Sequence, residues 1–151
     1  MRRGSEEYFT QVCTALQAPV KYKPTRQHDL GDLLNGGVSA YKKILKQAKY
    51  SARHWEKFEE LAKLEEIDEY SKDVLKRTNM ERWAVNPAVH FNHWSEFTPE
   101  DFRPVVHAFQ DLYFLFKCEH CGTFLHLTLK DNQQESVKCD CNRINWNLKG
   151  K

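Results

Sequence analysis

The 151-residue sequence has only six glycines and five prolines, too few for the many tight turns of an all-β protein. It has no apolar run near the roughly 20 residues that a membrane span needs. It also lacks a Gly-x-x-x-x-Gly-Lys loop, so the chain cannot be a P-loop ATPase by itself. The first residues, Met1–Glu7, have a basic start but no apolar segment of a secretory signal. We therefore expect a cytoplasmic protein that does not bind a membrane.

Apolar residues are plentiful, at 40% of the chain with nine Phe, six Tyr and four Trp, which is enough for a folded core. The net charge of +2 conceals a gradient. Residues 1–54 hold 10 basic and 4 acidic side chains, whereas residues 55–104 hold 7 basic and 12 acidic ones. The basic first third can face nucleic acid or the acidic middle of the chain, and four of its lysines fit a solvated helix face: Lys42, Lys43, Lys46 and Lys49.

Helical periodicity predicts a mainly α fold, with a bundle of four to five helices. Ser5 fits the cap of a first helix that ends near Ala18-Pro19. A second helix begins at Asp29, and Gly36-Gly37 either splits it or marks a close helix crossing. A third apolar stripe covers residues 55–74.

The segment 79–98 breaks this pattern at Asn86-Pro87. Thr98 fits the cap of a last helix, and Pro104 predicts a short 3₁₀ entry before the main helix starts near Arg103. Phe109 stands at the centre of the apolar stripe of this helix.

After residue 116 the pattern changes to short strands, predicted at 124–129, 136–139 and 143–148. The sequence thus predicts two domains, a helical bundle over 1–116 and a small β zinc ribbon over 117–151.

Four of the five cysteines form two pairs, Cys118-x-x-Cys121 and Cys139-x-Cys141, whereas Cys13 lies in an apolar helical stripe and reads as a core thiol. The first pair and the glycine after it have the form of a zinc knuckle. Four thiolates favour Zn²⁺ in a closed structural site. The second pair is one residue shorter than a knuckle, so three alternatives stay open: a histidine ligand (His120 or His126), paired disulfides, or an iron–sulfur cluster.

The ribbon can also bind nucleic acid, with aromatic and basic side chains for stacking and for phosphate. The candidate residues are His126, Lys130, Lys138, Arg143 and Trp146.

A further candidate group is Arg82, Asn86, His90 and His93. A helical bundle that brings Arg and His together can cleave RNA, with His in proton transfer and Arg stabilising the phosphate charge. The stretch Asn86-Pro-Ala-Val-His90, before a last helix that runs into the first cysteine pair, resembles a HEPN-type helical domain. RNases of that group carry a polar residue after the Arg, whereas here Trp83 follows Arg82. The resemblance therefore implies a metal-independent RNase using Arg82 and His90 only as an alternative.

The stretch Trp83-Ala-Val-Asn-Pro-Ala-Val-His90, with Phe97-Thr-Pro-Glu-Asp-Phe102 and the knuckle, resembles C-terminal regions of bacterial SMC- or AAA-type ATPases of mobile anti-phage defence clusters. This resemblance covers roughly residues 79–151. It implies a non-catalytic zinc-binding interaction module, an accessory subunit or detached C-terminal domain of a larger ATPase-type assembly. The expected partner is that larger protein or a second copy of the chain.

Overall fold

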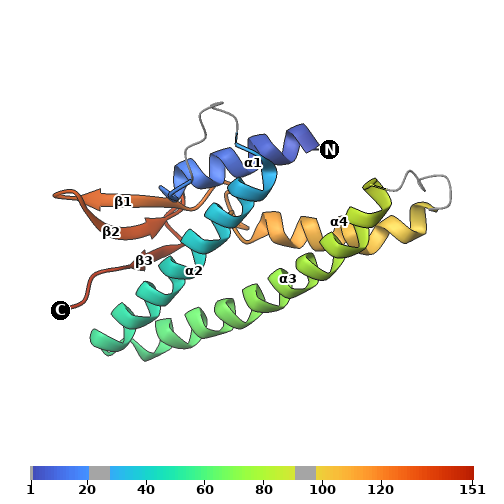
Figure 1. Ribbon diagram of the computed structural model, residues 1–151. Helices are drawn as coiled ribbons and strands as arrows, with labels where there is room; N and C mark the ends of the chain where they lie inside the picture. Colours follow the sequence, from blue (N-terminus) through green and yellow to red (C-terminus); the bar gives the residue numbers. More distant parts are fainter. Residues whose placement is uncertain (1, 21–27, 91–97) are drawn as a thin grey trace. The chain divides into compact units, whose positions relative to one another are not determined.

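The chain folds into helices followed by a small β-sheet (Figure 1). The computed structural model describes residues 2–20, 28–90 and 98–151, and these contain four α-helices and three β-strands. The helices are α1 (Arg2–Ala15), α2 (Leu30–His54), α3 (Phe58–His90) and α4 (Pro99–Phe114), and the strands are β1 (His126–Lys130), β2 (Gln133–Lys138) and β3 (Asn145–Asn147). The mainly helical fold with a small C-terminal sheet is confirmed. Among the described residues, no helix is both long and apolar enough to cross a membrane.

Packing divides the chain into two compact units. Unit 1 combines residues 1–65 with residues 116–151, and unit 2 consists of residues 66–115. The C-terminal sheet therefore shares a unit with α1 and α2. This grouping differs from the predicted domains 1–116 and 117–151. Because packing does not tell which segments fold alone, that division stays a prediction.

Helix α2 begins where the sequence predicts, with Asp29 as its cap. The Asp29 carboxylate accepts a hydrogen bond of 2.9 Å from the backbone N–H of Asp32, which satisfies one of the free N–H groups of the first turn. The predicted cap of α1 is wrong, because α1 starts at Arg2 and Ser5 lies inside it. Helix α1 also ends earlier than expected, at Ala15.

The glycine pair of α2 marks a close crossing with α1. A Cβ added at Gly37 would lie only 3.1 Å from Cγ1 of Val12, whereas one added at Gly36 would lie 3.4 Å from Cγ2 of Val20. Phe9 and Val12 are buried on the side of α1 that faces α2 at this point. The pair therefore does not split α2, and it is Gly37 that lets the two helices approach.

The sheet is antiparallel in the order β1-β2-β3, and its inner face joins the helical core of unit 1. Leu127, Val137 and Trp146 stand in register across the three strands, and all three are buried. The Trp146 ring lies 6.4 Å from the ring of Tyr41 in α2, centroid to centroid. The sheet thus rests on α2 and has no separate core.

Unit 2 contains most of α3 together with α4, and both helices run through prolines where breaks were predicted. Helix α3 continues past Asn86-Pro87 to His90, and α4 is one helix from Pro99 through Pro104. Pro104 is the sixth residue of α4 and lacks the N–H that would bond the Glu100 carbonyl oxygen, yet the helix continues through it. The predicted break and the predicted 3₁₀ entry are therefore both wrong.

The core of unit 2 runs along Val74 and Thr78 of α3 and along Ala108 and Leu112 of α4, all buried. The Thr78 hydroxyl bonds the Val74 carbonyl oxygen at 2.8 Å. Phe109, expected at the centre of the apolar stripe, is only half-buried because Ala108 and Leu112 take the inner positions.

Gly37→Leu should lower the free energy of unfolding by about 1–3 kcal/mol, because a larger side chain would overpack the crossing at Val12. Gly36→Ala is the matched control. It should leave stability unchanged or raise it by up to about 1 kcal/mol, since alanine favours helix and has room there. Urea titrations measure both, and equal effects of the two substitutions would contradict the crossing.

Candidate metal centre

The first cysteine turn begins two residues after the buried Phe116 ring. The Gly122 N–H donates to the Cys118 carbonyl oxygen at 2.8 Å, and the Cys118 N–H donates to the Thr123 carbonyl oxygen at 3.0 Å. Gly122 has a φ of 69°, in the left-handed region that favours glycine. The turn therefore places the sulfurs of Cys118 and Cys121 on one side, as the Cys-x-x-Cys-Gly pattern predicts.

The second cysteine turn follows β2 and has one residue fewer between its two cysteines than the first turn has. The Asn142 N–H donates to the Cys139 carbonyl oxygen at 3.0 Å, and the Cys139 N–H donates to the Ile144 carbonyl oxygen at 3.1 Å. Asn142 has a φ of 59°, and asparagine is one of the few residues that adopt this conformation readily. Asn142 is thus the counterpart of Gly122, a signal that the sequence contains and that was missed.

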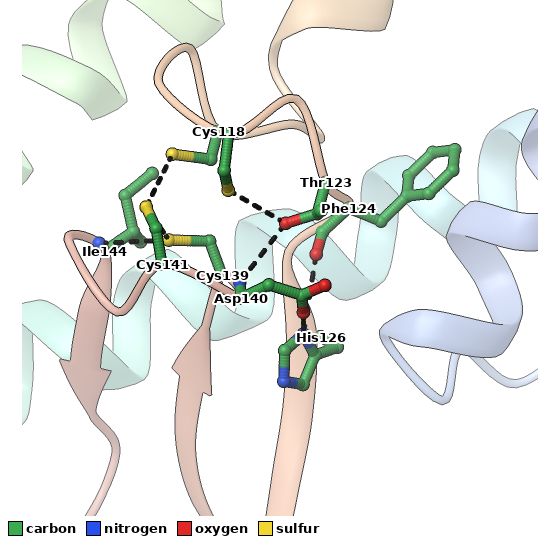
Figure 2. A network of polar contacts seen from close by, with 9 residues as sticks. Cys118, Thr123, Phe124, His126, Cys139, Asp140, Cys141 and Ile144 are labelled. Atoms are coloured by element: carbon green, nitrogen blue, oxygen red, sulfur yellow. Dashed lines mark hydrogen bonds and ion pairs between the residues drawn. The ribbon is translucent and has the colours of Figure 1, made fainter.

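Together the two turns bring four sulfurs to one point, the cysteine cluster Cys118, Cys121, Cys139 and Cys141 (Figure 2). All four sulfurs lie within 4.8 Å of one another. The Sγ of Cys141 lies 3.8 Å from that of Cys118 and 3.4 Å from that of Cys139. Tetrahedral ligation with Zn–S bonds of about 2.3 Å needs sulfurs about 3.8 Å apart. The cluster therefore has the size for one metal ion.

This geometry contains neither the paired disulfides nor a histidine among the converging ligands, whereas an iron–sulfur cluster would use the same four thiolates and stays an alternative. All five cysteines are free, so the paired disulfides are absent. His126 points its Nδ1 at the Phe124 carbonyl oxygen (3.5 Å) and at the Asp140 carboxylate (3.8 Å), and His120 is exposed. Among the described residues, the group of side chains that can hold a metal consists of the four cysteines.

Thr123 ties the two turns together around the sulfurs (Figure 2). Its Oγ1 accepts a hydrogen bond from the Asp140 N–H at 3.2 Å and lies 3.0 Å from the Cys121 sulfur. The hydroxyl proton is therefore free to point at Cys121. On the other side, the Ile144 N–H donates to the Cys139 sulfur at 3.3 Å. Such contacts orient ligands and stabilise their charged form.

The cluster without a metal favours only part of its thiols as thiolates. The Thr123 hydroxyl, followed by the backbone N–H groups of Thr123 and Cys141, lowers the pKa of Cys121 to about 5. The Arg143 N–H lowers the pKa of Cys141, but burial and the neighbouring sulfurs outweigh it and raise that pKa to about 12. Adjacent thiolates repel, so full deprotonation needs a bound cation.

The residues proposed for nucleic-acid binding by the ribbon do not form one surface with an exposed ring. Trp146 is only 8% exposed and packs against Tyr41, so the predicted stacking role of its ring is wrong. His126 and Lys138 are paired across β1 and β2, and both are half-buried. Lys130 and Arg143 are exposed.

The backbone of Arg82, Asn86 and His90 lies in α3 at intervals of four residues. Their side chains and the whole of His93 lie outside the described residues. The convergence of Arg82 and His90 that an RNase needs therefore stays a prediction.

Cys13 should behave differently from the cluster. Burial raises the pKa of its thiol, and its Sγ lies 3.2 Å from the Leu33 carbonyl oxygen. Ellman's reagent at pH 8 should therefore titrate Cys13 only after denaturation of the metal-free protein. The control is Cys13→Ala, which should lower the thiol count by one after denaturation and leave the count in the folded protein unchanged. Rapid reaction of five thiols before unfolding would contradict the burial of Cys13.

Comparison with known proteins assigns no family to the chain. No protein-family model, no curated protein and no solved structure matches it. The resemblance to HEPN-type domains and to defence ATPases therefore stays an expectation.

Proposed function

We propose that the cysteine cluster holds one structural Zn²⁺ and that the chain acts as a non-catalytic interaction module in a larger ATPase-type assembly. The observation that carries the proposal is the convergence of four sulfurs within 4.8 Å. Four thiolates prefer zinc among the common metals and leave no open position for substrate or water. The ion is thus structural. Such thiols persist in a reducing compartment, as in the cytoplasm.

The zinc stabilises more than the two turns that bind it. Phe116, just before the first turn, packs against Phe9 and Tyr41, and Trp146, just after the second turn, also packs against Tyr41. Metal binding holds both turns in place, and so it holds these two rings in the core of α1 and α2. In this proposal Zn²⁺ stabilises the whole of unit 1.

The interaction role is supported by exposed apolar side chains in addition to the resemblance. In unit 2, Phe114 is 63% exposed and Val106 is also exposed, both on α4. Covering these two side chains with a partner protein would remove their apolar surface from water, which is favourable. The partner proposed here is the larger ATPase-type protein, with self-association as the alternative.

Cys118→Ser should abolish stoichiometric zinc binding, because a thiolate ligand is lost. Since the sheet shares its core with α1 and α2, the loss should lower the melting temperature of unit 1 as a whole. Elemental analysis and thermal unfolding are measured on the same samples. The matched control is Cys13→Ser, which removes a buried thiol outside the cluster and should keep one zinc per chain. A Cys118→Ser protein with full zinc would rule out Cys118 as a ligand.

Isolation of the chain from its native host at native abundance tests the interaction role. We expect one larger ATPase-type protein to co-purify in stoichiometric amount, as found by mass spectrometry. Phe114→Ser should release it while the zinc content stays unchanged, and Phe58→Ser is the exposed-aromatic control. A chain that elutes as a partnerless monomer would contradict the proposal.

A further inference from the structure

Helix α2 carries an unusual distribution of charge. Between Asp32 and Glu56 the chain has no acidic residue. The same stretch contains five basic residues: Lys42, Lys43, Lys46, Lys49 and Arg53. A helix that needs only solubility commonly mixes both signs along its surface, so a stretch of one sign favours an anionic partner.

Three of these basic side chains gather on one side of α2. The opposite side is buried through Ile44, Ala48 and Ser51. The surface here called the α2 face is formed by five exposed residues, Lys42, Lys43, Lys46, Tyr50 and His54. Within the part of the chain that the structure describes, its three lysines form no ion pair, whereas Arg53 is paired with Glu65 at 3.1 Å.

An aromatic ring interrupts this basic face. Tyr50 is 61% exposed, and its ring lies 5.6 Å from the ring of His54. The C-terminal tail adds a further cation close by. Ser51 and Trp55 both donate to the Lys149 carbonyl oxygen, at 2.8 and 2.9 Å, and Lys151 lies 5.6 Å above the half-exposed ring of Trp55.

A pocket opens beside the other end of the α2 face. It has a volume of about 420 Å³, and Lys43 belongs to both the pocket and the face. Its lining residues include three that carry side-chain amides, Gln17, Asn35 and Gln134, together with Asp32 and the apolar Ile44. Amides both donate and accept hydrogen bonds, as the edges of a nucleobase do.

We propose that the α2 face binds a single-stranded polynucleotide. Its phosphates lie along Lys42, Lys43 and Lys46, one base stacks on Tyr50, and another enters the pocket. Seven residues of helix separate Lys43 from Tyr50, about 10 Å at 1.5 Å per residue, which leaves room for phosphates between the two base sites. Stacking on an exposed ring needs an unpaired base, which favours a single strand over a duplex.

An acidic protein would also pair with the three lysines of the α2 face. Such a partner would not account for the neighbouring pocket or for the exposed ring of Tyr50. The surface belongs entirely to unit 1 and contains no residue of the cysteine cluster. The inference is therefore independent of the proposed interaction role.

Fluorescence anisotropy of labelled 20-nucleotide strands with the zinc-loaded full chain tests the proposal. Single-stranded RNA, single-stranded DNA of the same sequence and the DNA duplex are compared at 50 to 300 mM salt. We expect single strands to bind more tightly than the duplex, and the RNA and DNA arms tell which sugar is preferred. Replacing Lys42, Lys43 and Lys46 by Gln should lower affinity at least about tenfold and reduce the salt slope by about 2.

Tyr50→Ala should weaken binding at least about fivefold with the salt slope unchanged, since stacking releases no counterions. Matched controls are Phe58→Ala for an exposed ring and the triple replacement of Lys63, Lys76 and Arg103 by Gln for equal charge loss; both should bind as the unchanged protein does. Far-UV circular dichroism verifies that every variant is folded.

Three outcomes would overturn the proposal. The first is the absence of salt-dependent binding to any strand, including the case in which the same lysines bind an acidic protein instead. The second is an equal loss in the charge control, which would mean non-specific attraction. The third is a loss caused only by replacing Lys130, Lys138 and Arg143 by Gln, which would move the site to the ribbon.

Discussion

The burial of the Phe116 ring holds together segments of unit 1 that are far apart in sequence. This ring packs edge-on against Phe9 of α1 and Tyr41 of α2, with centroid distances of 5.9 and 5.4 Å. Two residues later the chain reaches Cys118, so the position of the first cysteine turn follows from where the ring is buried. Tyr41 also contacts Trp146, which fixes the sheet on the other side of the cluster. Packing against α1 and α2 thus determines where the cysteine cluster lies, and a sheet of three short strands is sufficient to complete the cluster.

The features that could be predicted from the sequence are those decided within a few residues. The cap of α2 depends on Asp29 and the N–H three residues on, and the first cysteine turn depends on Cys118, Cys121 and Gly122. The strands follow from alternation, and their order follows from the short links between them. The conformation of the shorter second turn could not be predicted in the same way. Its residue with a left-handed φ is Asn142, whereas the zinc-knuckle pattern has glycine at that place.

The features that could not be predicted depend on distant partners. Trp146 reads as an exposed stacking residue until the sheet is placed against Tyr41, and nothing within ten residues of Trp146 indicates that contact. The predicted helix break at Asn86-Pro87 and the predicted 3₁₀ entry at Pro104 were wrong for a related reason. A proline weakens a helix by a local amount, whereas packing along the rest of that helix decides whether it continues. The attachment of the sheet to the helices is likewise not readable from nearby residues, because the core under the sheet comes from residues about 100 positions earlier, as the bond from Ser51 to Lys149 illustrates, with a separation of 98.

The interleaved order of the two units has a consequence for how the chain is made. The 50 residues from 66 to 115 must be synthesised after α1 and α2 and before the sheet that covers them. At about 5–20 residues per second this interval lasts about 3–10 s, far longer than a helix needs to form. Throughout it, the rings of Phe9 and Tyr41 have no Phe116 or Trp146 to cover them. The nascent chain is therefore most vulnerable to aggregation, and most in need of a chaperone, in the seconds before its last cysteines emerge from the ribosome.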